Sequence, residues 1–191
     1  MRHGHAIGFT LLATCACAGC GGAAFATGAP WDPKESRFFD DGVDVIDDMK
    51  RIDGEFAYRQ EDELTGRVNL ADLIAEVEIA TLQTTRDMDG GEQKRMDVRV
   101  VTTLYGGAPA ETITFASGSQ SPGHGMILRY EDRLSGRFLA FVRWFEDDRG
   151  RLAHHFHLSP ASEAMKADVQ ARIERRVAED EKAARAAKRG R

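Results

Sequence analysis

RFLAFVRWFEDDRGRLAHHFHL, residues 137–158, carries the clearest secondary-structure signal in this sequence. Residues 137–145 are apolar on both faces, which is typical of a central strand of a β-sheet. The DDRG segment at 147–150 has the Asp and Gly of a tight turn, and residues 151–158 then return as a second strand. Residues 137–158 therefore predict a β-hairpin.

Other strands are predicted before this hairpin. In ADLIAEVEIATL, residues 71–82, apolar residues alternate with polar ones at the period of a half-buried strand. After a turn signal at 87–91, alternation resumes at 96–105, and TITF at 112–115 gives a third strand. The apolar triplet at 126–128 is a candidate for one more. Because no helical pattern separates these strands, we expect a mainly β (α+β) fold, a small antiparallel five- to six-stranded barrel or meander.

A C-terminal helix is expected after the last strand. Ser159 is a good N-cap and Pro160 a good first helical residue. Apolar residues then recur every four positions and form one seam, namely Met165, Val169, Ile173 and Val177. From Lys182 onward, Lys and Arg are interspersed with alanine, which predicts a fraying helix or a disordered end. We assign residues 159–191 to this helix and its basic tail.

The segment 38–63 is rich in Asp and Glu, with apolar residues scattered among them. We expect it to be irregular or partly helical and to pack on the outside of the β-domain, with its acidic groups forming a solvated face. These groups lack the D-x-D-x-D-G spacing and the later Glu of a calcium loop. Together with the strands, the segment makes up a predicted unit at 38–158.

The three cysteines of the chain all lie in LLATCACAGCGG, residues 11–22. A short basic start precedes an uncharged run of apolar and small residues at 6–18, which is typical of a secretory signal and too short to cross a membrane. The AGC that ends at Cys20 resembles the end of a bacterial lipobox, which implies a diacylglyceryl group on the thiol. We therefore predict a signal peptide at 1–19, and a lipidated Cys20 with a flexible tether at 20–37.

Two alternatives to lipidation remain open. Cys17 stands where a lipobox usually has Leu, and AFA at 24–26 fits an ordinary cleavage site that would release a soluble chain. The C-x-C-x-x-C spacing could also hold a metal or an iron–sulfur cluster, although its flanks are those of a signal peptide. With no cysteine after Cys20, the mature chain suits an oxidising compartment. We expect an exported, membrane-anchored protein of the cell envelope, with a periplasmic or secreted soluble protein as the alternative.

The charge of the chain argues against one class of partner. The formal net charge is −5, and removal of residues 1–19 leaves 25 basic against 31 acidic residues. An acidic balance of this kind gives no support to nucleic-acid binding. The length suits a single domain with a sizeable core.

HHFH at 154–157 is the strongest candidate for a metal site. His155 and His157 share one face of a strand, and two imidazoles at this spacing can hold Cu or Zn. His124 and Met126, on a Gly-rich loop, could supply further ligands, a set that suits copper. Local spacing supplies no third His, Asp or Glu. Two neutral histidines on a solvent-facing strand are therefore the alternative interpretation.

The sequence contains no recognisable catalytic motif. Ser117, Ser119 and Ser121 lie near His124, but they do not form the G-x-S-x-G elbow of a hydrolase. A dinucleotide-binding or Walker motif is also missing from the sequence. We therefore expect a non-enzymatic binding or structural module without a cofactor. Its candidate partners are the membrane, through Cys20, and another envelope protein.

Two stretches of the sequence resemble a group of uncharacterised bacterial exported lipoproteins. They are PKESRFFDDGVD, residues 33–44, and the region 138–164, which contains FLAFVRWFEDDRG and HHFHLSPASEA. The resemblance implies the order lipobox, linker, acidic segment, β-domain and helix, and it implies no activity or catalytic residue. A run of short strands closed by a helix is also similar to OB-like and netrin-like barrels of secreted binding modules. This chain lacks the netrin-like disulfides, so protease inhibition is not implied.

Overall fold

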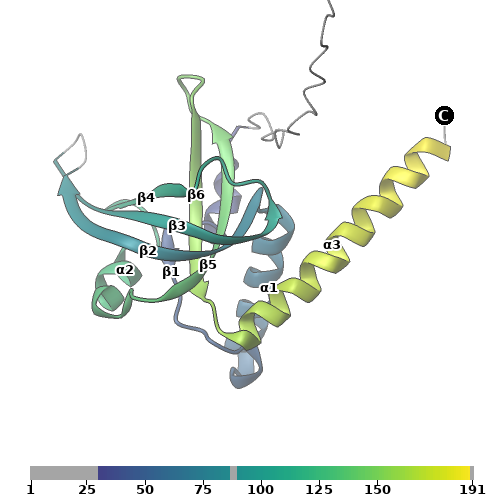
Figure 1. Ribbon diagram of the computed structural model, residues 1–191, viewed down its shortest axis with the longest axis horizontal. Helices are drawn as coiled ribbons and strands as arrows, with labels where there is room; N and C mark the ends of the chain where they lie inside the picture. Colours follow the sequence, from purple (N-terminus) through teal and green to yellow (C-terminus); the bar gives the residue numbers. More distant parts are fainter. Residues whose placement is uncertain (1–29, 87–89, 190–191) are drawn as a thin grey trace, which may run out of the picture.

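The computed structural model describes residues 30–86 and 90–189; Cys20 and the predicted signal peptide lie outside these residues. Six strands form one sheet in the order β1-β6-β5-β2-β3-β4, which curls into a half-barrel (Figure 1). The strands are β1 Gly42–Val43, β2 Leu73–Arg86, β3 Glu92–Gly106, β4 Thr112–Gly118, β5 Arg137–Glu146 and β6 Leu152–Pro160. Neighbours pair antiparallel, except that β1 runs parallel to β6. The predicted antiparallel sheet and its C-terminal helix are confirmed.

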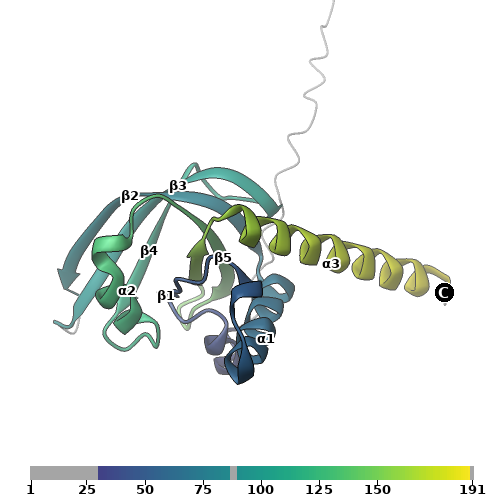
Figure 2. The same cartoon turned by 90° about the horizontal axis from the view of Figure 1, so that it is seen from below.

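Helices of two kinds accompany the sheet in the described residues. The α-helices are α1 Gly54–Leu70, α2 His124–Tyr130 and α3 Glu163–Arg189, and the 3-10 helices are η1 Pro33–Arg37, η2 Met49–Arg51 and η3 Glu131–Arg133. Figure 2 shows α2 below one end of the curled sheet, α1 below the other end, and α3 running outward from the body. None of the described helices is long and apolar enough to cross a membrane.

Two apolar cores use the opposite faces of the central strands. Inside the curl, Phe115 of β4 stacks on Phe156 of β6 with 4.4 Å between ring centroids and 10° between ring planes. Because β4 and β6 are not neighbours in the sheet, this contact joins the two sides of the half-barrel. On the other face, Phe141 of β5 packs with residues of α1 and α3. The fully buried members of both cores lie between Phe38 and Ile173.

The hairpin predicted at 137–158 is confirmed, because β5 and β6 pair along their whole length. By contrast, residues 126–128 lie in α2, so the prediction of a strand there was wrong. The Met126 N–H bonds to the Gly123 carbonyl at 3.0 Å, and Ile127 is fully buried in the inner core. Three apolar residues carry too little periodicity to distinguish a helix from a strand.

The C-terminal helix begins later than predicted, so the assignment of Ser159 and Pro160 to its start was wrong. Both residues belong to β6, and Ser159 pairs with Leu139. The N-cap is Ser162, whose Oγ accepts the Met165 N–H at 3.0 Å. Ser159 belongs to the sheet because its side chain bonds to Asp44 and its backbone pairs with Leu139.

The predicted apolar seam of this helix is confirmed for three of its four residues. Met165, Val169 and Ile173 are at most 4% exposed, whereas Val177 is 40% exposed. The helix nevertheless continues to Arg189, so its described end is helical rather than disordered.

The acidic segment 38–63 is more than a covering on the outside of the sheet. It supplies β1 at one sheet edge, η2 and the first part of α1. Phe39 and Val43 are almost fully buried, and Asp41 is only 6% exposed. The prediction that its acidic groups form a solvated face was therefore wrong for the carboxylates around β1. His157 and Arg67, which are both buried, and the partly exposed His155 accompany these carboxylates.

Candidate functional site

A group of buried and half-buried ionisable side chains lies where β1 pairs with β6. We call it the Asp–His cluster, and its members are Asp40, Asp41, Asp44, Arg67, His155 and His157. The aspartates flank β1, the histidines project from β6, and Arg67 comes from the last turn of α1. The pairing of Gly42 with His157 fixes this arrangement.

His157 is the centre of the Asp–His cluster. Its side chain is 3% exposed, with Nδ1 2.7 Å from Asp40 Oδ1 and Nε2 3.0 Å from Asp44 Oδ2. Ionised carboxylates only accept hydrogen bonds, so both ring nitrogens must carry a proton and the ring is an imidazolium. Burial and the nearby Arg67 charge lower the pKa of His157, but Asp40 and Asp44 outweigh them and raise the pKa above its ordinary 6.5.

The two carboxylates around His157 are correspondingly held in the ionised form. Burial raises the pKa of Asp44, but the hydrogen bond and charge of His157 and the charge of Arg67 bring it below its ordinary 3.8. The same opposing effects lower the pKa of Asp40. Asp44 Oδ2 also accepts a 2.8 Å hydrogen bond from Ser159 Oγ. The result is a saturated network that fastens β1 to β6.

Asp41 holds the other histidine. It has a left-handed backbone with φ of 54°, and its Oδ2 lies 2.8 Å from His155 Nδ1 and accepts a 3.1 Å bond from Ser121 Oγ. The His155 ring contacts Trp31 and Phe145, with centroid distances of 4.3 and 4.9 Å, and these two rings are 5.3 Å from each other. A catalytic triad needs the histidine between the serine and the aspartate. Here the aspartate is in the middle, so this set does not activate Ser121 as a nucleophile.

The four predicted metal ligands are divided between two elements. His155 and His157 share one face of β6, as the sequence predicts, and both contact aspartates. His124 and Met126 belong to α2, where His124 Nδ1 lies 2.9 Å from the Ser117 carbonyl oxygen and Met126 packs on the inner core. Within residues 30–86 and 90–189, no group of three or more His, Cys, Asp or Glu is arranged to hold a metal ion. One ring nitrogen of His157 would have to lose its proton and leave its carboxylate before that ring could bind one.

The sequence analysis missed the aspartates that complete this cluster. Asp40 and His157 are 117 positions apart, and Asp44 and His157 are 113 apart. No local spacing connects residues so distant in the chain. The available signal was the pair of histidines on one strand face, which marked one half of the cluster.

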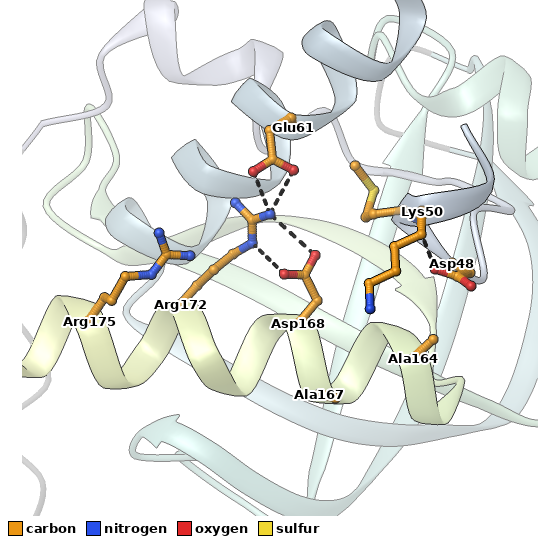
Figure 3. Close-up of a pocket in the computed structure, with 9 residues that line it drawn as sticks. Asp48, Lys50, Glu61, Ala164, Ala167, Asp168, Arg172 and Arg175 are labelled. Atoms are coloured by element: carbon orange, nitrogen blue, oxygen red, sulfur yellow. Dashed lines mark hydrogen bonds and ion pairs between the residues drawn. The ribbon is translucent and has the colours of Figure 1, made fainter. Parts of the chain in front are cut away.

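A second polar feature is a groove of about 520 Å³ between η2, α1 and α3 (Figure 3). Arg172 of α3 lies at its centre and is 7% exposed. Its Nη2 donates to both carboxylate oxygens of Glu61 at 2.7 Å and to Asp168 at 3.2 Å. Ala164 and Ala167, also on α3, line the groove with short side chains that leave space for a ligand.

Two cations of this groove have no ionic partner among the residues that the structure describes. In Figure 3, Lys50 and Arg175 lie toward opposite ends of the groove, with Arg172 and Asp168 between them. Across residues 30–86 and 90–189, neither the Lys50 ammonium nor the Arg175 guanidinium forms an ion pair or a side-chain hydrogen bond. The members of the Asp–His cluster bond to one another, whereas Lys50 and Arg175 in this groove remain available to bind a ligand. The groove is therefore the better candidate for ligand binding.

No family model, curated protein or solved structure matches this chain. The resemblance to bacterial exported lipoproteins therefore stays a prediction from the sequence. The function has to be argued from the groove, the Asp–His cluster and the N-terminal sequence.

Proposed function

We propose that this chain is an exported protein of the cell envelope, anchored to a membrane by a lipid on Cys20. Its domain is a non-enzymatic binding module, and the groove between α1 and α3 binds an acidic segment of another envelope protein. The observation that carries the binding role is the pair of unpartnered cations, Lys50 and Arg175, in that groove (Figure 3).

The lipid anchor rests on the N-terminal sequence. An uncharged run at 6–18 leads to the small-small-Cys motif at Cys20, and the domain begins near Pro30, which bridges to Glu146. The ten residue steps from Cys20 to Pro30 can span at most about 36 Å. A lipid on Cys20 would therefore keep the domain close to the membrane surface while leaving it free to turn.

The groove has the size for a short segment of chain, and two of its three cations are left to bind carboxylates; Asp48 also lines it. A volume of about 520 Å³ lies within the range of small ligand sites, about 300–1,000 Å³. Along α3, Arg175 is eleven positions after Ala164, which corresponds to about 16 Å of helix. Arg172 is already engaged by two carboxylates, so Lys50 and Arg175 are the groups left to pair with a ligand. An extended peptide with carboxylates near both ends fits this spacing.

Binding of a fluorescein-labelled hexaglutamate peptide, followed by anisotropy, tests the groove. We expect the wild-type chain to bind it and the K50Q/R175Q variant to bind about tenfold more weakly, because two lost charge pairs at about 0.7 kcal/mol each amount to about 1.4 kcal/mol. The control is K34Q/R149Q, which removes two exposed cations outside the groove and should change the affinity less than about twofold. Equal loss in both variants, or no binding by the wild type, would remove the groove from the proposal.

Fractionation of the producing cells tests the anchor separately. The wild-type chain should remain with the membranes through washing without detergent in about 1 M salt, which screens any attraction between the basic end of α3 and anionic lipids, and a Cys20→Ala variant should not. A Cys20→Ala chain that stays on the washed membranes would rule out lipid on Cys20 as the anchor.

A further inference from the structure

The C-terminal half of α3 leaves the body of the domain. Arg176 is its last residue with a contact to the rest of the domain: Nη1 donates to the Val68 carbonyl at 2.6 Å, and the guanidinium lies 4.1 Å from the Tyr105 ring centroid. Every residue at 177–189 is exposed, and the helix runs free of the other elements in both views (Figures 1 and 2). These 13 residues correspond to about 20 Å of helix.

This free end gains little from its own contacts. A helix of about 13 residues is marginal in water unless an amphipathic face packs on something. Within the described residues 177–189, the ion pair is Glu181 with Arg185 at 3.0 Å, and Lys182, Lys188 and Arg189 have no partner. A surface that binds these cations would supply the missing stabilisation.

The cations of the free end share one face. At 100° per residue, they fall within a sector of about 120°, and alanines occupy the opposite side. The cations are Lys182, Arg185, Lys188 and Arg189, and the alanines are Ala183, Ala184, Ala186 and Ala187. Residues 182–191 contain five basic residues and no acidic one, so the rest of the mature chain has 20 basic against 31 acidic residues. An anionic surface would attract the end of α3 and repel the body.

We infer that the free end of α3 docks on the headgroups of anionic phospholipids. A basic face favours an anionic lipid surface, and each Lys or Arg near such a surface adds to the attraction. Val177 is the one large apolar residue at 177–189, so the free end lacks the anchors by which a helix fills a groove of a protein partner. Docking would occur at the headgroups, without insertion. This inference does not depend on the lipid at Cys20.

Flotation with vesicles tests the inference on a chain expressed from residue 21, which has no acyl group. Such a chain keeps both cores, because they lie between Phe38 and Ile173. One set of vesicles contains phosphatidylcholine alone, and the other contains equal parts of phosphatidylcholine and phosphatidylglycerol. We expect at least about tenfold stronger binding to the anionic vesicles, weakening as salt rises from about 50 to about 300 mM.

The test variant is K182Q/R185Q/K188Q/R189Q, and the matched control is K34Q/R129Q/R133Q/R149Q, which removes the same charge elsewhere. The test variant should lose at least about tenfold in anionic-vesicle binding, while the control stays within about twofold. Melting temperatures should agree between wild type and test variant, because the free end packs on nothing in the described domain. Equal vesicle binding by test variant and wild type, or no preference for phosphatidylglycerol, would overturn the inference. If the test variant lost binding to the hexaglutamate peptide while its vesicle binding stayed unchanged, the inference would also be overturned, in favour of an acidic protein partner.

Discussion

Replacement of His157 by Gln should destabilise the domain much more than replacement of its β6 neighbour His155. The ring is 3% exposed and bonds to Asp40 and Asp44 through its two nitrogens. A Gln amide is neutral and can donate from only one end, so one buried carboxylate faces an acceptor. Removal of one partner from a buried ionic pair costs about 3–5 kcal/mol. Because Arg67 still compensates both carboxylates, we expect about 3 kcal/mol, or a melting temperature about 6–12 °C lower.

The pH dependence gives the sign of this effect. The pKa of His157 is raised above 6.5 in the folded state, so its contribution to stability is complete below pH 6.5 and is lost as pH rises through the folded pKa. The pKa values of Asp40 and Asp44 are lowered, so their contribution is present above pH 3.8 and is lost as pH falls through the folded values. The cluster therefore stabilises most between pH 3.8 and 6.5. Burial lowers the pKa of His154, which gives the opposite slope, so the informative quantity is the difference between wild type and His157→Gln.

Urea denaturation of both proteins between about pH 5 and pH 9 measures this difference, which should shrink as pH rises through the folded pKa of His157. The control is His155→Gln on the same face of β6, where the ring is 29% exposed and meets one aspartate. That substitution should cost only about 1 kcal/mol. A cost for His157→Gln no larger than for His155→Gln, or a difference that grows with pH, would refute the imidazolium clamp.

Four further substitutions test the packing of β1 and α3. A Cβ at Gly123 would lie 2.6 Å from the backbone nitrogen of Gly42, so Gly123→Ala should displace β1. Urea denaturation should show a free energy of unfolding about 2–3 kcal/mol lower, and an unchanged midpoint would contradict this close approach. Ser162→Ala removes the N-cap of α3 and should cost about 1 kcal/mol in the same assay, whereas no loss would mean that the cap contributes nothing. Ile173→Ala should cost about 2–4 kcal/mol, but Val177→Ala under about 0.5 kcal/mol, and similar losses would place Val177 in the core.

The parts of the fold that the sequence predicts are those with a local signal. The hairpin at 137–158 is recognisable because two apolar segments flank an Asp- and Gly-containing turn, and all of its information lies within 22 residues. The start of α3 has two candidate serines, Ser159 and Ser162, and only tertiary contacts choose between them. Ser159 bonds to Asp44 and pairs with Leu139 in the sheet, so Ser162 is the cap instead.

Other features of the site depend on contacts that no local pattern records. The strand β1 has two residues, too few for any alternation, and it exists because Gly42 can approach Gly123 closely. The partners of His157 lie more than 110 positions away, so the sequence predicts the histidine face but not its carboxylates. The groove likewise joins η2, α1 and α3, whose charges look like ordinary surface charges until the helices pack.

The intact mass of the protein extracted from its producing cells decides whether Cys20 carries the membrane anchor. We expect the mass of residues 20–191 plus a covalent lipid on Cys20. The mass of residues 27–191 without lipid would contradict the anchor and identify a free exported domain instead.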